Sequence, residues 1–394
     1  MAAVCGQTVV AAGVAGLGDV PRGERVHIAI FGLRNAGKST LANALTGQPL
    51  ALVSEVPGTT TDPVSKAMEI LPLGPCLLTD TAGLDDEGEL GARRVRRSLE
   101  VLATVDVAVW VVSPQAGVRE NEFHARFWAE CARRSVAVVE YRRGESVEAL
   151  RDRLAKLAPA ERQSGLLDGV VGPGANVLCV CPIDASAPKG RLILPQVETL
   201  RACLDAGATV CVCQPRDLGR LLAAGGRYDL AVTDSQAFGA VAAVLPPEQP
   251  LTSFSILFAR QKGDLSAYRD GLERLASLRD GDVVLVAEGC THRRQCGDIG
   301  TVKIPAALRR LTGRELEFRF ASGGGFDLSG RRPSLVVQCG GCMLTRREVL
   351  RRLALARAAG VPVVNYGMLL AKAAGVDVAR CLAAVGWRRA EPCA

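Results

Sequence analysis

The chain has 394 residues, of which 48% are hydrophobic and 23% charged, which is ordinary for a soluble globular protein of two to four domains. Its net charge is +7, but the arginines are scattered through helical stretches and only 4% of the residues are aromatic, so we expect no nucleic-acid partner. No apolar run approaches the ~20 residues that span a bilayer, and 14 cysteines indicate a reducing compartment, so we expect a cytoplasmic protein without a membrane partner.

A phosphate-binding loop follows the first predicted strand. The apolar run 26–32 leads into the sequence Gly-Leu-Arg-Asn-Ala-Gly-Lys-Ser, and a helix is predicted directly after it. In this strand–loop–helix setting, backbone N–H groups of the loop and the helix N-terminus hold phosphates. We expect Lys38 to bridge the β- and γ-phosphates and Ser39 to bind Mg²⁺. The candidate nucleotide-binding residues here are Gly32, Asn35, Ala36, Gly37, Lys38, Ser39 and Thr40.

Two further segments have the character of nucleotide-sensing loops. Residues 57–62 form a hydroxyl-rich loop of the kind that closes over Mg²⁺ and the γ-phosphate. Thr59 and Thr60 are therefore candidate nucleotide-binding residues, and Thr60 is a second candidate ligand of Mg²⁺. A predicted strand ends at Asp80, and Gly83 follows it with an N–H group that can detect the γ-phosphate. Together with the phosphate loop, these residues predict a GTPase.

The first third of the chain resembles the translation-factor-related GTPases of the Era, Der and MnmE type. The resemblance implies that Asn35 helps to hold a K⁺ ion, which stands in for an arginine finger. Leu84 stands where a glutamine would orient the attacking water, so we expect slow hydrolysis without K⁺. The base-reading Asn-Lys-x-Asp motif does not occur between 84 and 180, and residues 142–145 read Arg-Arg-Gly-Glu instead. We therefore expect a domain shortened by a strand–helix unit, with base recognition relaxed or nucleotide binding lost.

The middle of the chain predicts a small parallel sheet. Residues 158–175 are rich in Gly, Pro and Ala and are typical of a linker, and strand and helix patterns then alternate from 177 to 245. Cysteines at 179, 181, 211 and 213 lie in strand-like runs, where each pair shares one sheet face and packs as small apolar residues. No catalytic constellation stands out, so we expect a dimerisation surface and a homodimer.

The last third of the chain carries a candidate metal site. Two predicted strands end just before Cys290 and Cys339, and ligands of open α/β sheets gather beyond such strand ends. The turn from Cys339 to Cys342 places two thiolates within reach of one metal, while Cys290 and His292 can supply a third thiolate and a weaker fourth group. This set suits an iron–sulfur cluster with one replaceable position or a zinc site, and spacing does not separate the two. Cys296 is a spare candidate ligand.

Along nearly its whole length the chain resembles the HydF family, the scaffold GTPases of [FeFe]-hydrogenase maturation. The family's cluster signature is a Cys-x-His pair followed at a distance by Cys-x-x-Cys, and Gln338 replaces the histidine that usually precedes the second pair. The other segments that carry the resemblance are 32–40, 58–64, 80–91, 182–196 and 288–300. The resemblance implies a [4Fe–4S] cluster on Cys290, Cys339 and Cys342, with His292 as an exchangeable fourth ligand. It also implies a diiron subcluster precursor, made by radical-SAM maturases and delivered to apo-[FeFe]-hydrogenase.

We therefore expect an α/β protein of three domains: a P-loop GTPase-like domain over 1–160, a small parallel α/β dimerisation domain over 175–275, and an α/β iron–sulfur cluster domain over 276–394. The expected cofactors are the [4Fe–4S] cluster, the diiron precursor, GTP and Mg²⁺, with K⁺ as a further candidate. The main role would be that of a non-enzymatic scaffold, with GTP hydrolysis left open. The alternatives are an Era- or MnmE-like GTPase of RNA modification or ribosome assembly with a metal-binding C-terminal domain, and a zinc-stabilised structural protein.

Overall fold

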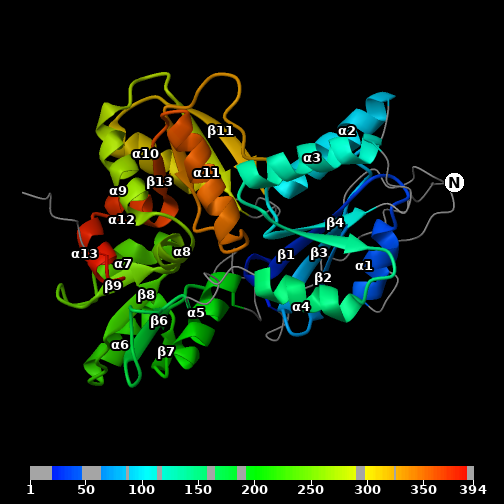
Figure 1. Ribbon diagram of the computed structural model, residues 1–394. Helices are drawn as coiled ribbons and strands as arrows, with labels where there is room; N and C mark the ends of the chain where they lie inside the picture. The colour runs from blue at the N-terminus through cyan, green and yellow to red at the C-terminus, as the bar shows by residue number, and fades with distance from the viewer. Residues whose placement is uncertain are drawn as a thin grey trace, which may run out of the picture.

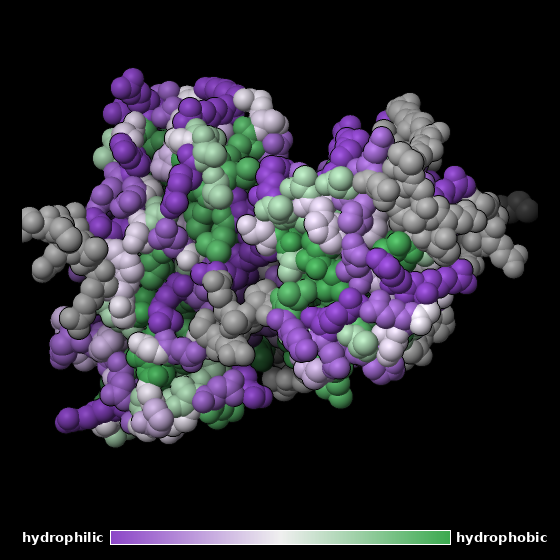
Figure 2. Space-filling view, viewed as in Figure 1, coloured by the Kyte–Doolittle hydropathy of each residue, from purple (hydrophilic) through white to green (hydrophobic). Residues whose placement is uncertain are grey.

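The protein is described by a computed structural model over residues 20–46, 64–85, 88–112, 118–157, 165–183, 192–289, 298–323 and 325–387. Three α/β units follow one another along the chain, each built on its own sheet (Figure 1). The expected α/β class is confirmed. Polar side chains cover much of the face seen in Figure 2, with apolar side chains showing between them. Among the described helices, none has the length and apolar character that crossing a bilayer requires.

The first unit is a five-stranded sheet covered by helices on both faces. Its elements are η1 (Arg22–Glu24), β1 (Val26–Phe31), α1 (Lys38–Thr46), β2 (Val64–Ile70), β3 (Gly74–Asp80), α2 (Gly88–Leu102), β4 (Val107–Val112), α3 (Val118–Arg133), β5 (Ala137–Arg142) and α4 (Val147–Leu157). The strand order is β2-β3-β1-β4-β5, and β2 alone runs antiparallel to its neighbour. Helices α1 and α4 pack on one face, and α2 and α3 on the other.

The position of each strand in this sheet explains its composition. β1 is central and buried along its whole length, because both of its faces are covered, and it therefore reads as a continuous apolar run. β5 lies at the edge of the sheet, and within the described residues no further strand follows it there. Helix α4 comes directly after β5 and returns to the face that carries α1.

The second unit is a four-stranded parallel sheet in the order β7-β6-β8-β9. Its elements are β6 (Asn176–Val180), α5 (Leu194–Asp205), β7 (Thr209–Cys213), η3 (Pro215–Asp217), α6 (Leu218–Ala223), β8 (Leu230–Thr233), η4 (Ser235–Ala237), α7 (Phe238–Ala242), β9 (Leu251–Ser253) and α8 (Phe254–Lys262). The alternation of strands and helices agrees with the pattern that the sequence predicts for this region.

The third unit is also a four-stranded parallel sheet, in the order β11-β10-β12-β13. Its elements are α9 (Leu265–Glu273), η5 (Arg274–Ser277), β10 (Val283–Glu288), η6 (Ile299–Lys303), α10 (Ile304–Thr312), β11 (Glu317–Ser322), β12 (Leu335–Gln338), α11 (Arg346–Ala358), β13 (Val363–Asn365), α12 (Tyr366–Ala373) and α13 (Val378–Ala383).

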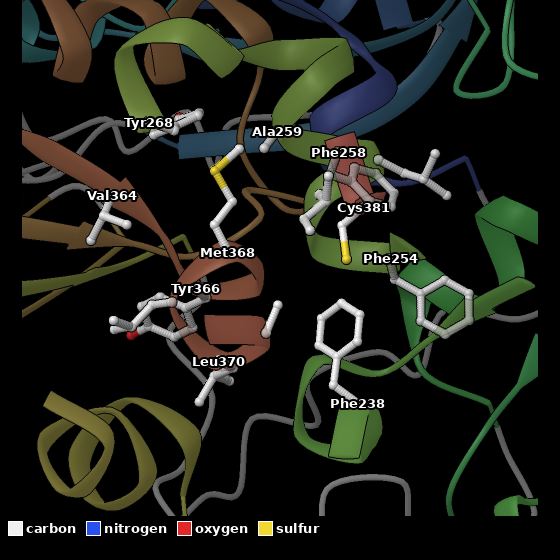
Figure 3. Packing of buried hydrophobic residues seen from close by; sticks show 14 of the residues in the cluster. Phe238, Phe254, Phe258, Ala259, Tyr268, Val364, Tyr366, Met368, Leu370 and Cys381 are labelled. Atoms are coloured by element: carbon white, nitrogen blue, oxygen red, sulfur yellow. The ribbon is translucent and has the colours of Figure 1, made fainter. Parts of the chain in front are cut away.

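One apolar core runs through the second and third units. Figure 3 shows Phe238 and Phe254 of the second unit packed around the same space as Met368 of the third. Cys381 from α13 lies in this core, far in sequence from the strands that it approaches. The two units are therefore joined by packing, whereas the first unit has its own two cores.

Candidate functional site

The phosphate loop lies between the carboxyl end of β1 and the start of α1, as the sequence predicts. Its turn places Asn35 (φ 61°) and Gly37 (φ 101°) in backbone conformations that most side chains avoid and that glycine and asparagine tolerate. The Nζ of Lys38 donates to the carbonyl oxygens of Leu33 at 2.7 Å and Gly32 at 3.3 Å. The ammonium therefore lies over the loop whose N–H groups would hold the phosphates.

Ser39 and Asp80 meet beside this loop because β1 and β3 are neighbours, with Ile30 paired to Asp80. The Oγ of Ser39 donates to Oδ2 of Asp80 at 2.6 Å. Burial raises the pKa of Asp80, while the hydrogen bond from Ser39 and the charge of Lys38 lower it. A hydroxyl and a carboxylate side by side suit Mg²⁺, which takes oxygen ligands, and a bound cation would favour the ionised form of Asp80.

The segment after β3 is pressed against the phosphate loop. A Cβ atom on Gly83 would lie 2.9 Å from the nitrogen of Arg34, which is closer than real Cβ atoms come to other atoms. Leu84 N donates to Gly32 O at 3.3 Å, and Arg34 N donates to Oδ1 of Asp85 at 2.6 Å. Gly83 thus lies next to the loop that would hold the phosphates, and its role in detecting the γ-phosphate stays a prediction. Asp85, which the sequence did not suggest, binds an N–H group of the loop itself.

Glu145 is the acid closest in sequence to the position where a base-reading aspartate is expected. Glu145 follows β5, accepts a hydrogen bond from the nitrogen of Arg142 at 3.2 Å and forms an ion pair with Arg153. A small cavity of about 60 Å³ lies between α1 and the ends of β4 and β5, and Tyr141 and Arg143 contribute to its lining. The carboxylate of Glu145 is therefore already bound by other groups of the protein.

The cysteine turn lies at the carboxyl end of β12, beside the end of β10. Cys339 N donates to Ala287 O at 3.0 Å, and Gly289 N donates to the Sγ of Cys339 at 3.1 Å. Gly341 adopts left-handed backbone (φ 75°) within the turn that leads to Cys342. N–H groups aimed at a cysteine sulfur tune iron–sulfur sites, so this arrangement fits a cluster ligand.

The remaining predicted ligands lie outside the described residues: Thr59, Thr60, Cys290, His292 and Cys296. Gly289, the neighbour of Cys290 in the chain, contacts the Sγ of Cys339, so the segment that carries the third cysteine starts beside the turn. Within the described part of the chain, no three or more His, Cys, Asp or Glu side chains form a group that could hold a metal ion. The complete ligand set therefore stays a prediction.

Burial controls the protonation of the two cysteines in the turn. It raises the pKa of Cys339, although N–H groups of Gly341 and Gly289 and the charge of Arg352 lower it. It raises the pKa of Cys342 to about 12, with a smaller contribution from the neighbouring Cys339. Both groups are therefore thiols at neutral pH in the metal-free protein, and a metal must displace a proton from each.

A buried charged cluster that the sequence did not suggest adjoins the turn. Lys262 ends α8 and is only 3% exposed, and its Nζ donates to the carbonyl oxygens of Leu344 at 2.9 Å and Cys342 at 3.3 Å. The same Nζ forms an ion pair with Oε1 of Glu24 at 2.9 Å. Glu198 on α5 is close by, and burial raises its pKa to about 8 although the charge of Lys262 lowers it.

This cluster joins the three units at one point. Glu24 precedes β1, Lys262 belongs to the second unit and Cys342 to the third. A Cβ atom on Gly23 would lie 2.6 Å from Leu344 O and 2.7 Å from Cys342 O, so η1 is packed tightly on the cysteine turn. β1 then runs for six residues to the phosphate loop, which is roughly 20 Å at ~3.3 Å per residue. The cysteine turn and the nucleotide site thus lie at opposite ends of one strand.

The cysteines of the second unit are placed as the packing interpretation expects. Cys179 and Cys181 are fully or almost fully buried at β6, and Cys203 of α5 belongs to the same core. Cys211 and Cys213 are half-buried on the edge strand β7 and pack against that core.

Three family models match the chain. "Hydrogen maturase F tetramerization domain" matches residues 266–384, "Hydrogen maturase F dimerization domain" matches residues 166–263, and "50S ribosome-binding GTPase" matches residues 27–140. The two hydrogen maturase F models together account for more than half of the chain. The three matches follow the same order along the chain as the three sheets.

Curated relatives match a shorter part of the chain. The tRNA modification GTPase MnmE of Methylobacterium sp. (strain 4-46) is 41% identical over 110 residues, which are 26% of this chain and 25% of that protein. MnmE of Moorella thermoacetica is 42% identical over 102 residues, which are 25% of this chain and 21% of that protein. The chain thus spans about a quarter of the length of these relatives, or less.

Solved structures superpose poorly on the whole chain. The G domain of the T. maritima FeoB iron transporter is 19% identical and covers 34% of this chain and 99% of its own, with a TM-score of 0.25. Era of Aquifex aeolicus bound to GDP and aluminium fluoride is 16% identical and covers 75% of this chain and 93% of its own, with a TM-score of 0.26.

Proposed function

Because the chain belongs to the HydF (hydrogen maturase F) family, we propose that it acts as a scaffold and carrier in [FeFe]-hydrogenase maturation. In this role it binds a [4Fe–4S] cluster and holds the diiron subcluster precursor for transfer to apo-hydrogenase. The precursor comes from radical-SAM maturases, and the carrier works as an oligomer built through its dimerization and tetramerization domains. The observation that supports this proposal most is the cysteine turn, where Gly289 N donates to the Sγ of Cys339.

The chain itself would hold the cluster with Cys339 and Cys342 from the turn and Cys290 from the segment after Gly289. His292 is the proposed exchangeable ligand, because an imidazole is a weaker donor to cluster iron than a thiolate and an incoming group can displace it. When bound, the cluster supplies an iron atom with a replaceable ligand position. The surrounding protein half-buries the two cysteines, fixes the backbone of the turn through Lys262 and directs an N–H group at the sulfur of Cys339.

The first unit is a P-loop GTPase domain, and its loop supports the binding of GTP and Mg²⁺. We propose that Ser39 and Asp80 hold the Mg²⁺, with Thr60 as a further ligand, and that Asn35 assists K⁺. The nucleotide would be held through its phosphates rather than its base, because Glu145 is engaged by Arg153 and by the backbone. Hydrolysis of GTP, where it occurs, would be slow without K⁺.

The MnmE-like alternative explains only part of the chain. Its supporting matches end within the first unit and leave the cysteine turn and the second and third units without a role. The hydrogen maturase F models match those two units instead. We therefore keep RNA modification as the second candidate, supported by the sequence of the GTPase domain alone.

Anaerobic reconstitution with iron and sulfide, followed by EPR of the reduced protein, tests the proposal. Cys339→Ala should lose the cluster signal and most of the bound iron and sulfide, whereas Cys211→Ala, which removes a half-buried thiol on β7, should keep both. Wild-type protein that binds zinc but takes up no iron and sulfide would overturn the cluster assignment in favour of a structural zinc site.

A further inference from the structure

Arg352 is one of the largest fully buried side chains in the described part of the chain, with 1% of its surface exposed. It lies on α11, the helix that begins just after the cysteine turn. Burying a guanidinium is costly unless its donors find acceptors and its charge finds a partner. The position therefore needs an explanation beyond helix formation, because an apolar side chain would pack there without that cost.

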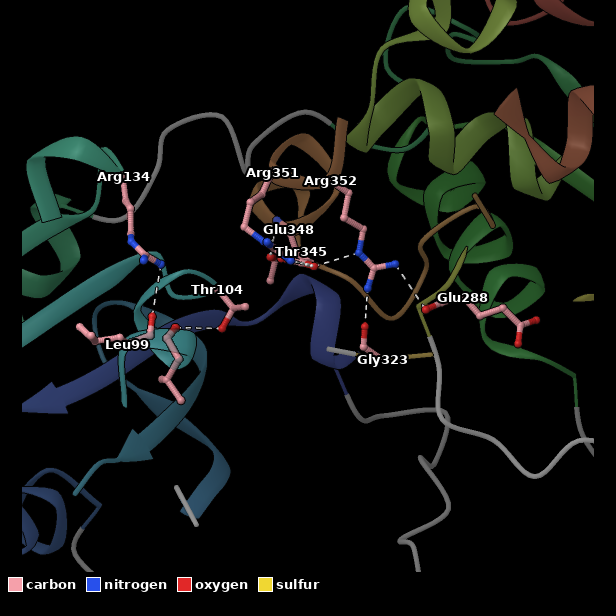
Figure 4. A network of polar contacts seen from close by, with 10 residues as sticks. Leu99, Thr104, Arg134, Glu288, Gly323, Thr345, Glu348, Arg351 and Arg352 are labelled. Atoms are coloured by element: carbon pink, nitrogen blue, oxygen red, sulfur yellow. Dashed lines mark hydrogen bonds and ion pairs between the residues drawn. The ribbon is translucent and has the colours of Figure 1, made fainter. Parts of the chain in front are cut away.

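The contacts of Arg352 join helix α11 to the ends of β10 and β11 (Figure 4). Its Nε donates to Oε1 of Glu348 at 2.8 Å, one turn earlier on the same helix. One terminal nitrogen donates to the carbonyl oxygen of Glu288 at 3.4 Å, and the other donates to the carbonyl oxygen of Gly323. The guanidinium also lies over the ring of Phe326, 5.2 Å from its centroid. Every nitrogen of the group is thus engaged.

The two carbonyl groups belong to the ends of β10 and β11. Glu288 is the last residue of β10, and its carbonyl oxygen also accepts a hydrogen bond from Gly323 N at 3.1 Å. Gly289 comes next and contacts the Sγ of Cys339, and Cys290 follows it. Arg352 therefore fixes the backbone at the point where the chain turns toward the third cysteine.

The carboxylate that pairs with Arg352 is shared with a second arginine. Glu348 is shared by Arg351 and Arg352, with Arg351 donating to both of its carboxylate oxygens at 2.6 and 2.8 Å. One carboxylate thus faces two guanidinium groups, so Glu348 alone does not neutralise both of them. The guanidinium binds the carbonyl oxygen of Glu288, and the next residue, Gly289, donates to the Sγ of Cys339, so the positive charge lies near that sulfur. The buried carboxylate of Glu288 acts in the opposite direction.

We propose that Arg352 is a positioning residue for the cluster, which holds the ends of β10 and β11 around the cysteine turn and supplies a fixed positive charge behind Cys339. This inference rests on the proposed cluster binding. Reduction adds an electron to an anionic cluster, and a buried cation favours the more negative state. Arg352 therefore keeps the reduction potential of the cluster higher than the thiolates alone would set it.

Three variants of the full-length protein separate charge from geometry. Arg352→Gln removes the charge, Arg352→Lys keeps the charge but loses the forked donors, and Arg351→Gln removes the charge from the more exposed neighbour on Glu348. Each is reconstituted with iron and sulfide and titrated with dithionite while the EPR signal of the reduced cluster is recorded. The rate of iron loss to a chelator reports on how firmly the cluster is held.

We expect Arg352→Gln to shift the oxidised-to-reduced equilibrium at least tenfold toward the oxidised cluster, which is a fall of about 59 mV for one electron. Arg352→Lys should stay closer to the wild-type potential but lose iron faster, and Arg351→Gln should change either property less than Arg352→Gln does. A wild-type potential in Arg352→Gln would overturn the electrostatic role. If that variant does not fold, a wild-type rate of iron loss in Arg352→Lys would overturn the positioning role. Failure of the wild-type protein to take up a cluster would instead refute the proposed function.

Discussion

The phosphate loop and the cysteine turn differ in how much of the molecule each one needs. The described groups of the nucleotide site come from residues 32–39 and 80–85, which two neighbouring strands of one sheet bring together. The cysteine turn of the third unit depends on the other two units, because Lys262 at the end of α8 donates to its carbonyl oxygens and pairs with Glu24 before β1. A site made within one sheet can be moved between proteins as a module, whereas a site at a junction depends on how the units are assembled.

The two sites are also connected through the structure. β1 joins them directly, with the phosphate loop at its carboxyl end and the packed Gly23–Glu24 turn at its amino end. Arg347 on α11 adds a second link, because it donates to the carbonyl oxygen of Arg134 after α3. Substitutions at the two ends of β1 therefore test whether the two sites depend on each other.

The largest expected effect separates the two sites completely. Lys38→Ala should abolish nucleotide binding, because it removes the cation that lies over the phosphate loop, and should leave iron and sulfide content unchanged. Cys342→Ala should do the reverse, losing the cluster and keeping nucleotide affinity. Titration calorimetry with GTP and Mg²⁺, together with iron analysis, measures both. Loss of both properties in either variant would mean that the sites are one cooperative unit.

A large loss of stability is expected at the junction. Lys262→Met leaves the carboxylate of Glu24 without its buried ammonium partner and removes the donor to Cys342 O and Leu344 O. Breaking a buried pair in this way costs about 3 kcal/mol, at the lower end of the usual range because the Glu24 side chain is one third exposed. Urea unfolding of cluster-free protein measures this. Glu24→Gln/Lys262→Met, which removes both charges, should recover part of the loss.

Gly23→Ala should cost about 1–3 kcal/mol of folding stability, because its Cβ atom would overlap the carbonyl oxygens of Leu344 and Cys342. Gly219→Ala on α6 is the matched control, since the nearest atom to a Cβ there is 3.9 Å away. Thermal unfolding of both variants compares them. Equal melting temperatures would show that η1 is not packed firmly on the cysteine turn.

Glu198 should make the stability of the cluster-free protein depend on pH. Burial raises its pKa from 4.5 to about 8, so the folded state binds this proton more tightly than the unfolded state does. The resulting stability is fully present below pH 4.5 and is lost as the pH rises through about 8. Between these pH values the free energy of unfolding should therefore fall less in Glu198→Gln than in the wild type. The difference should be at least about 1.4 kcal/mol, the equivalent of one pKa unit. Parallel pH curves for the two proteins would contradict this.

The smallest effect is expected at the base-reading position. Glu145→Gln should change the affinity for GTP by less than about tenfold, because the carboxylate is already held by Arg153 and the nitrogen of Arg142. The wild-type preference for GTP over ATP should stay below ~100-fold, since no Asn-Lys-x-Asp motif that reads the guanine edge occurs between 84 and 180. Strong guanine selectivity that is lost in Glu145→Gln would show that this acid does read the base.

The features that could be predicted from the sequence are those that depend on local chain geometry. The phosphate loop could be placed because its glycines, lysine and serine act within one strand–loop–helix segment, and the parallel sheets because buried strands read as apolar runs. The cysteine turn could be recognised for the same reason, since two cysteines three residues apart in a tight turn can reach one metal in many structural settings. The predicted positions of Ser39 and Asp80 needed only the pairing of two adjacent strands.

The distant side chains that surround these segments could not be predicted from the sequence, because they depend on tertiary packing. Lys262, Glu198 and Arg352 carry no motif, and each would be read from the sequence as a solvated charge on a helix. Lys262 and Arg352 are buried because the units pack together, so each charged group must find partners from other parts of the chain, whereas Glu198 is half-buried. The joint core of the second and third units was hidden for the same reason, since an apolar pattern shows which face of an element is buried but not against what.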